Sequence, residues 1–496
     1  MIKTKRIINN KFLLLFFGIL IIFLSQLTLP ILFEVKTGAK FYILLIGTII
    51  GIMLIDFNNV KKISKNAFIL IFTFGTVIAL IRPVQYALDE ESHLENAIGI
   101  TDSFLFEYSA EDLKDYDSVL NHDWLRNQHN YKGDRYWYNV EHKKSQISGN
   151  PVSFDNPSFL PGAIGWNLGR LISDKVYISY YLGRIFHVLT YALLISFAIK
   201  ISKVYKNVIF LLGTLPAALY VIAAFHYDYL YYAASLILIA MLTNIFSGVE
   251  KITRGFIYKF QLVILLFVFS KFPFVLLGSL LCVLPEKYFV SKKYKRYAIL
   301  SFIPTMLFAL IYSGILNLFG FTGSVTGKSP GLGYFLVHPL PIVRTMLDAP
   351  NAILENFIRQ PLQYVTHNSP MLSSITTIII LISLFVTSFF VRFKLPKVFK
   401  YYTLLLLLGI TFLMVFAITG DPRVYNPGDI FVGGVQGRYY FFMLCILPIY
   451  LNDWLSNYFD FSILSEKNEI NFTIFLQYAM TFLVIFTVSI GFYTQI

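Results

Sequence analysis

Long runs of apolar side chains, separated by short polar turns, follow one another along the whole chain. A membrane-spanning helix needs about 20 mostly apolar residues to cross the hydrocarbon core. The pattern therefore predicts an all-α membrane protein with 13 spans, at 12–33, 40–56, 66–82, 176–200, 207–225, 229–247, 256–270, 272–285, 297–319, 371–391, 401–419, 438–452 and 472–491. Pro273 separates two short runs, which form either one hairpin or two half-helices.

Lysine and arginine gather in alternate connections between these spans. Cytoplasmic loops of membrane proteins carry an excess of these residues. Three connections are rich in them, at 57–65, 286–296 and 392–400, whereas 453–471 holds a single lysine and fits the alternation least well. We therefore predict a multi-pass protein with a cytoplasmic N-terminus and an extracytoplasmic C-terminus.

Three polar segments then fall on the outer side, at 83–175, 320–370 and 420–437. The first contains 15 of the 28 acidic residues and three of the four tryptophans, so we expect a large extracytoplasmic loop of mixed structure after the third span. The second has the composition of a lid, and its stretch "APNAILENFIRQPLQYV" suggests a short amphipathic helix lying on the membrane.

The net charge of the chain gives little information beyond the predicted membrane topology. Only 14% of the residues are charged and 56% are hydrophobic, and the net charge of +13 follows from the lysine-rich cytoplasmic connections. No nucleic-acid partner is needed to explain it. Cys282 and Cys445 both lie inside apolar runs, where a structural disulfide is implausible, so they do not identify the compartment.

An acidic cluster, "LDEESHLENAIGI", follows the third span at the predicted outer boundary of the membrane. Asp89 and Glu90 lie four and three positions before His93, so each pair can share one face of a helix. A carboxylate at the rim of a low-dielectric site can act as a general base. The three side chains can also hold a divalent cation such as Mg²⁺ or Mn²⁺. The alternative is that they only solvate a loop.

Several ionisable side chains interrupt apolar segments on the same outer side. Such groups are costly at membrane depth and usually face a cavity. They are Arg184, His226, Asp228, Lys271 and Arg438. Arginine and lysine suit a phosphate, so together they favour a site for an anionic, membrane-borne ligand. Singly, each could pair with a nearby acid or extend to the interface.

Four stretches together resemble the DUF2142 family of bacterial membrane proteins, which is grouped with the GT-C glycosyltransferases. They are "ALDEESHLENA", "GTLPAALYVIAAFHYDYLYYAASL", "FVFSKFPFVLLGSLLCVLPEK" and "GGVQGRYYFFMLCILPIY". The resemblance covers most of a core at 66–452. It makes 1–65 an N-terminal transmembrane hairpin and 453–496 a C-terminal loop and last span.

The resemblance implies a GT-C-like bundle in the bacterial cell membrane. It implies transfer of a sugar from a polyprenyl-phosphate-linked donor to a cell-surface glycan or similar acceptor on the outer face. Asp89 matches the acid of the loop motif, and Glu90 and His93 complete it. Asp228 matches a later acid. Positions that hold the donor phosphate or sugar correspond to Lys271, Gln436 and Arg438.

Under this hypothesis Asp89 takes the acceptor proton. Arg184, Lys271 and Arg438 stabilise the departing lipid phosphate. Other readings remain open at this point. They are a transporter or flippase of lipid-linked sugars, a polysaccharide polymerase or ligase, and a scaffold without activity. Membrane lipids are partners in every case.

Overall fold

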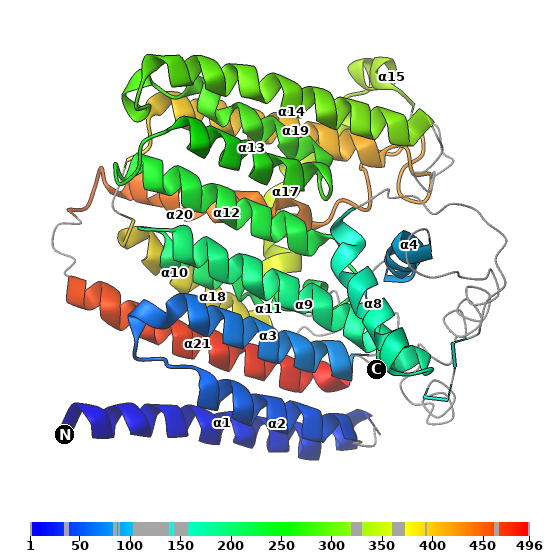
Figure 1. The fold of residues 1–496 in the computed structure, drawn as a ribbon, viewed down its shortest axis with the longest axis vertical. Helices are drawn as coiled ribbons and strands as arrows, with labels where there is room; N and C mark the ends of the chain where they lie inside the picture. The colour runs from blue at the N-terminus through cyan, green and yellow to red at the C-terminus, as the bar shows by residue number, and fades with distance from the viewer. Residues whose placement is uncertain are drawn as a thin grey trace.

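The computed structural model describes residues 2–33, 39–82, 87, 90–102, 138–139, 141–142, 157–318, 330–359, 373–391, 394–460 and 466–494. Within these ranges the protein is helical, and the β-structure consists of two isolated bridges. Most of the helices run lengthwise through one bundle (Figure 1). The N-terminus and the C-terminus lie at opposite ends of it.

Six helices in the described ranges are long and apolar enough to cross a membrane. They are α3 (Ile63–Ile81) with the short turn η1 (Val60–Lys62) before it, α9 (Val176–Ile201), α12 (Asp228–Phe246), α14 (Lys292–Leu318), α19 (Lys397–Ile418) and α21 (Glu466–Thr494). Further apolar helices are α1 (Ile2–Phe33), α2 (Ala39–Leu54), η3 (Phe272–Val283) and α18 (Ser373–Phe389). The predicted all-α fold with several membrane-length helices is confirmed, and the count of 13 spans stays a prediction.

Three predicted spans are not simple α-helices. The run 207–225 is divided into α10 (Lys206–Gly213) and α11 (Pro216–Ile222), because Pro216 has no N–H to continue the helical ladder. The run 256–285 forms α13 (Arg254–Val268) and the 3₁₀-helix η3, which pack against each other as a hairpin. The run 438–452 begins with the 3₁₀ turn η7 (Gly437–Tyr440) before α20 (Phe441–Leu455).

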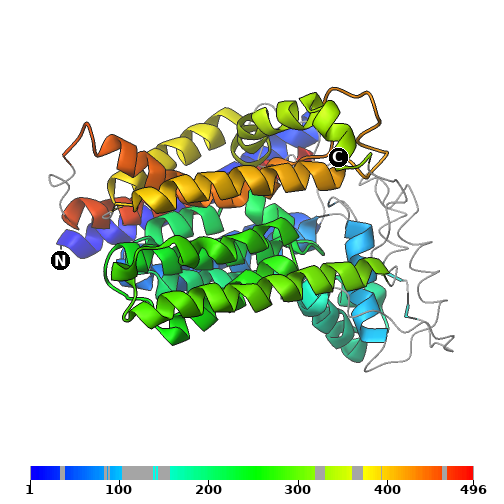
Figure 2. The same cartoon turned by 90° about the horizontal axis from the view of Figure 1, so that it is seen from above.

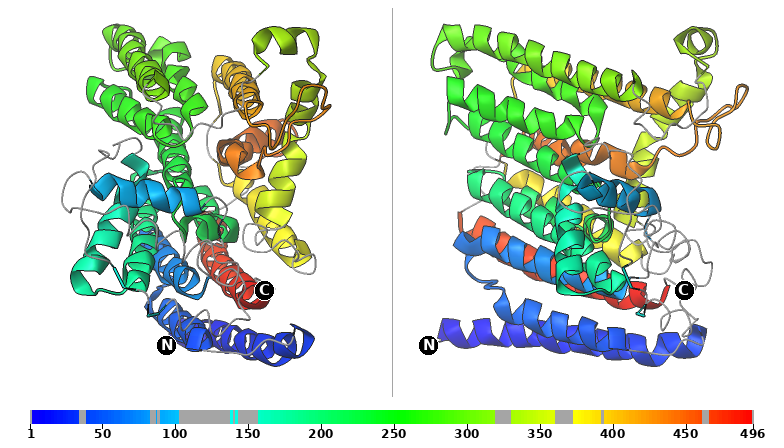
Figure 3. Two further views of the ribbon diagram at one scale, coloured as in Figure 1. Left: turned by 90° about the vertical axis from the view of Figure 1, so that its right-hand side faces the viewer. Right: turned by 45° about the vertical axis from the view of Figure 1, so that its right-hand side comes forward.

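Helix α12 forms the centre of the bundle. All of its residues are buried, as expected for a helix that is apolar on every side. Neighbouring contacts come from α9, α13 and α20. At one edge of the bundle, α1 and α2 lie next to each other and α1 packs against α21 (Figure 3).

Short helices cover the end of the bundle opposite the N-terminus. Helix α4 (Glu90–Asp102) crosses the direction of the long helices there, close to α8 (Leu160–Ile172), as Figure 2 shows for α4 in light blue. Helices α15 (Leu332–Val337), α16 (Leu340–Leu347) and α17 (Ala349–Ile353) and the π-helix η5 (Leu354–Arg359) follow α14 along the chain. Most of 83–175 lies outside the described residues, as do 319–329 and 360–372.

The predicted amphipathic helix at 349–365 therefore takes another form where it is described. Helix α17 and η5 pack against η7 and α18, and Ala349 and Ile358 are buried there. The exposed apolar face of this region belongs to α15 and α16, which precede them.

Glycines on α8 allow it to lie unusually close to α9. A Cβ on Gly165 would come within 2.4 Å of the Leu182 carbonyl oxygen. A Cβ on Gly169 would come equally close, 2.4 Å, to the Cα of Ser179. Both obstacles are backbone atoms, so no side-chain rotation can relieve them. This close contact aligns the N-terminal half of α9, which carries Arg184, with α8 and α4.

We predict that Gly165→Ala lowers the melting temperature of the purified protein in detergent, because the new methyl group meets backbone. Overpacking of this kind typically costs about 1–3 kcal/mol. Gly409→Ala in α19 is the matched control, since no atom lies within 4 Å of its added Cβ. That control should leave stability unchanged or raise it by up to about 1 kcal/mol. Equal behaviour of the two variants would contradict the packing argument.

Candidate functional site

A buried ion pair joins α4 to α9 at the end of the bundle opposite the N-terminus. Arg184 donates from Nε to Glu90 Oε1 over 2.7 Å and from Nη2 to Oε2 over 2.6 Å. Its remaining N–H groups donate to the carbonyl oxygens of Ala79 (3.0 Å) and Arg82 (3.1 Å) and to the Tyr180 hydroxyl (2.6 Å). A guanidinium has five N–H groups, so all of them are engaged inside the protein.

This saturation changes the interpretation of Arg184. The side chain has no N–H left for a phosphate, so its geometry favours holding α4, α3 and α9 together. Glu90 also accepts a hydrogen bond of 3.2 Å from the Phe225 N–H. Burial alone would raise the pKa of the Glu90 carboxyl, but the Arg184 guanidinium outweighs it and holds that pKa below its usual range. Glu90 is therefore ionised, and it is a poor general base.

A second buried cluster surrounds Asp228, the first residue of α12. Lys271 Nζ lies 3.1 Å from Asp228 Oδ1, and Arg438 Nε lies 3.3 Å from Oδ2. The Asp228 and Arg438 side chains are 0% and 2% exposed. Although burial disfavours a charged lysine, the neighbouring Asp228 carboxylate raises the pKa of Lys271 above its usual range. Two cations thus share one carboxylate.

His226 completes this cluster as a neutral ring. Burial, with the positive charges of Arg438 and Lys271 close by, holds the pKa of His226 well below its usual range. Its Nε2 lies 2.9 Å from Arg438 Nη1, and its Nδ1 lies 3.0 Å from the Asp228 backbone N. A neutral imidazole has only one acceptor nitrogen, so two donors compete for it. Lys271, Arg438 and the Asp228 backbone N–H thus supply donors to a cluster whose one described carboxylate is that of Asp228.

Two tyrosines that the sequence did not single out flank Lys271. Its ammonium lies 4.7 Å from the ring centre of Tyr227 and 4.1 Å from that of Tyr439, in cation–π geometry. It also donates to the Tyr227 hydroxyl over 3.3 Å. Each tyrosine adjoins a predicted site residue in sequence, Asp228 or Arg438, and that adjacency was the available signal.

His93 connects the two clusters. Its ring lies edge-on to the rings of His226 (4.6 Å between centres) and Tyr227 (4.9 Å), and it also contacts Phe159. The structure thus brings Glu90, His93 and Arg184 together with His226, Asp228, Lys271 and Arg438. Asp89 lies outside the described residues. Gln436 precedes η7, and its Oε1 accepts no hydrogen bond from the described residues.

The charges of the joined clusters do not balance among the described side chains. The two clusters contain two carboxylates, those of Glu90 and Asp228. Four buried or nearly buried cations lie near them, namely Arg82, Arg184, Lys271 and Arg438. Unpaired charge in a low-dielectric setting is costly. The described side chains of the two clusters thus carry a net positive charge.

The same geometry bears on the expected divalent cation at Asp89, Glu90 and His93. Both carboxylate oxygens of Glu90 accept from Arg184, so they are not arranged to ligate a metal ion. Within the described ranges, no group of three His, Cys, Asp or Glu side chains is placed to hold one. The described residues thus do not fit a metal site there.

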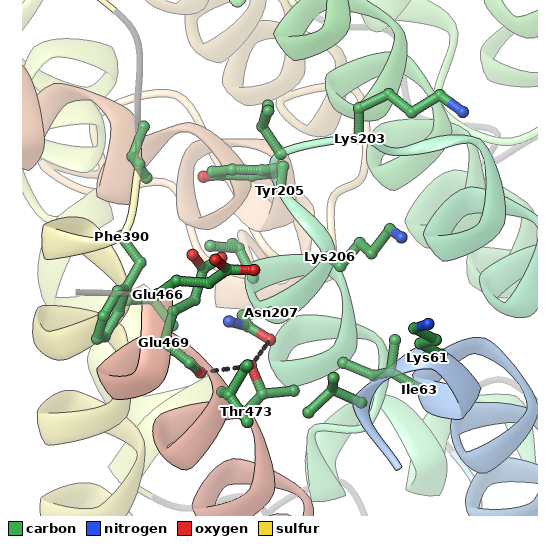
Figure 4. A pocket seen from close by; sticks show the side chains of 16 residues that line it. Lys61, Ile63, Lys203, Tyr205, Lys206, Asn207, Phe390, Glu466, Glu469 and Thr473 are labelled. Atoms are coloured by element: carbon green, nitrogen blue, oxygen red, sulfur yellow. Dashed lines mark hydrogen bonds between the residues drawn. The ribbon is translucent and has the colours of Figure 1, made fainter. Parts of the chain in front are cut away.

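A pocket of about 330 Å³ lies at the other end of the bundle, where η1, α10 and α21 begin (Figure 4). Its walls carry lysines and glutamates, among them Lys61, Lys206 and Glu469, and its described lining contains none of the predicted site residues. Thr473 donates to the Asn207 side-chain oxygen there over 3.0 Å and ties α21 to α10. We regard this pocket as a junction between helix ends.

We predict that Glu90→Gln or Arg184→Met lowers the melting temperature strongly, because each leaves a buried charge without its partner. The expected loss is about 3–5 kcal/mol for either single variant. The double variant Glu90→Gln/Arg184→Met should recover part of that loss. As a control, Glu141→Gln removes the exposed pair with Lys175 and should change little. A strong effect of Glu141→Gln would contradict a specific role for the Glu90–Arg184 pair. An unchanged melting temperature in both single variants would contradict it as well.

Comparison with known proteins identifies the family. The family model described as a predicted membrane protein (DUF2142) matches residues 72–447, leaving α1, α2 and α21 outside the match. No curated protein and no solved structure matches the chain. The matched region contains both charged clusters and spans most of the chain. The protein therefore belongs to the DUF2142 family of predicted membrane proteins.

Proposed function

We propose that this protein is a membrane-embedded glycosyltransferase of the GT-C type. It moves a sugar from a polyprenyl-phosphate-linked donor to a cell-surface glycan or similar acceptor on the outer face of the bacterial membrane. The observation that carries the proposal is the Asp228 cluster, where Lys271 and Arg438 converge on one carboxylate beside a neutral histidine. Such a donor-rich, buried site suits the phosphate of a lipid-linked sugar.

The proposed reaction is a single displacement at the anomeric carbon. The acceptor hydroxyl gives its proton to Asp89 while its oxygen forms the new glycosidic bond. The bond from the anomeric carbon to the phosphate oxygen breaks, and polyprenyl phosphate leaves with the electron pair. Lys271 and Arg438 stabilise the negative charge that grows on this phosphate, as fixed cations do in phosphate-leaving reactions.

The remaining residues act mainly by holding helices, cations or the sugar in position. Arg184 and Glu90 hold α4 in place, and His93 rests on His226 and Tyr227 beside the phosphate-binding groups. Asp228 keeps both cations fixed and orients sugar hydroxyls. Gln436, with an acceptor oxygen unpaired among the described residues, is a further candidate for the sugar.

The proposal includes the 13-span topology, with the N-terminus cytoplasmic and the large loop 83–175 outside. An odd number of crossings agrees with termini at opposite ends of the bundle (Figure 1). The lysine-rich η1 lies at the N-terminal end, and the charged clusters lie at the other, where α4 is. This supports an active site that opens to the outer leaflet.

A transporter or flippase of lipid-linked sugars is the second candidate, because it would need the same phosphate site. A polysaccharide polymerase or ligase would also use a lipid-linked donor. The products separate these functions. A transferase or polymerase releases free polyprenyl phosphate or diphosphate, whereas a transporter moves the intact lipid-linked sugar across the bilayer.

We predict that Asp89→Asn abolishes sugar transfer, because the amide cannot accept the acceptor proton. Folding and membrane insertion should stay intact. The assay is release of polyprenyl phosphate by the purified protein in proteoliposomes supplied with polyprenyl-phosphate-linked glucose, mannose or galactose and with a cell-surface glycan fraction as the acceptor. Wild-type rates in the variant would refute Asp89 as the base. Intact donor crossing the bilayer without release would favour the transporter.

Lys271→Met and Arg438→Lys should each lower kcat/KM for the donor, by about 100-fold for loss of one fixed donor to the leaving phosphate. Arg438→Lys keeps the charge but loses the guanidinium fork. Lys175→Met is the matched control, since Lys175 is also near the outer end but pairs with the exposed Glu141. Unchanged kcat/KM in both site variants would remove the basis of the proposal.

A further inference from the structure

The helices α15 and α16 present a continuous apolar surface at the outer end of the bundle. Leu336 and Leu347 are 75% and 77% exposed, which is unusual for leucine in a folded segment. The exposed apolar side chains of the two helices are Leu332, Leu336, Val337, Leu340, Val343 and Leu347. Between Gly331 and Leu347 the chain carries one permanently charged side chain, Arg344, and one histidine, His338.

The opposite face of the same two helices is firmly packed. Phe335 and Ile342 are buried in a small cluster with Val415 of α19 and with Tyr425 and Val432 of the loop that follows it. Hydrogen bonds reinforce this contact. The Val432 N–H donates to the Thr345 hydroxyl over 3.0 Å, and the Gly428 N–H donates to the Tyr334 hydroxyl over 3.0 Å. The exposed face therefore belongs to a well-anchored unit.

The position of this unit indicates what covers the exposed face. In Figure 1, α15 is seen nearly end-on, whereas α14 and α19 run lengthwise across the picture. Helix α15 thus crosses the direction of the membrane-length helices at a steep angle. Helix α16 packs against α19, which exposes its own leucines along its length, among them Leu405 and Leu408. The short helices are thus anchored on a helix of membrane-spanning length whose own apolar side chains are exposed.

We propose that α15 and α16 form an in-plane membrane anchor whose exposed face lies in the outer leaflet, at the boundary between headgroups and acyl chains. An amphipathic helix with one apolar face binds a lipid surface in this way. A protein partner would usually meet a polar rim around such a patch, but here the patch belongs to a unit packed against the membrane-length helix α19, which exposes apolar side chains of its own. The inference does not depend on the transferase proposal.

The anchor also has a consequence for the site. Its packed face holds the loop 420–436, and this loop leads directly into Gln436 and Arg438. Contact with the outer leaflet therefore sets the height of Arg438 relative to the lipid headgroups.

Site-directed spin labelling tests this anchor. In a Cys282→Ser/Cys445→Ala background of the full chain, labels are attached through Leu336→Cys, Val343→Cys or Leu347→Cys. The polar control is Arg423→Cys, at an arginine whose side chain is 78% exposed in the neighbouring loop. Proteoliposomes of phosphatidylethanolamine and phosphatidylglycerol are exposed to oxygen, which concentrates in the bilayer, and to a water-soluble nickel chelate.

The proposal expects labels at 336, 343 and 347 to collide severalfold more often with oxygen than with the nickel chelate, and the label at 423 to show the reverse. Three independent positions guard against a single misfolded variant. Nickel-dominated collisions at all three would mean that the face lies in water and would overturn the proposal. Low collision rates with both reagents would overturn it as well, because the face would then be covered by protein, such as a second copy.

Discussion

The buried ion pair between Glu90 and Arg184 is the constraint on which the end of the bundle opposite the N-terminus depends. A charge at membrane depth is tolerated only when its partners surround it, and here one carboxylate, two carbonyl oxygens and one hydroxyl engage all five guanidinium N–H groups. The pair fixes the first turn of α4 against α3 and α9. One turn later, His93 is thereby held against His226, so the acidic loop is joined to the Asp228 cluster.

Much of the fold could be predicted because its main signal is hydropathy. Long apolar runs identified the membrane-length helices, and α4 was expected from the spacing of Glu90 and His93. The break inside 207–225 was missed, since hydropathy averages over Thr214 and Leu215 although Pro216 ends the hydrogen-bond ladder there. The 3₁₀ form of η3 was equally invisible, because it depends on packing between α13, α14 and α19 rather than on composition.

The residues that form the candidate site could be predicted from the sequence, but the role of each one could not. Lys271, Asp228 and Arg438 were expected to share a site, and the structure brings them together. Arg184 was grouped with them because sequence shows a charge in an apolar run but not its partner, which lies 94 positions away. The tyrosines beside Lys271 were overlooked for a related reason, since a tyrosine near a membrane interface is common whatever its role.

The sharing of Asp228 by two cations explains how two positive side chains can lie close together inside the protein. Lys271 and Arg438 would repel each other in a low-dielectric setting, and the single carboxylate keeps both charged and close. In the proposed reaction the same two cations would face the phosphate of the lipid-linked donor, with no further positive charge supplied by the histidine beside them. The neutral state of His226 matters for the same reason, because it adds no charge of its own while it contacts Arg438.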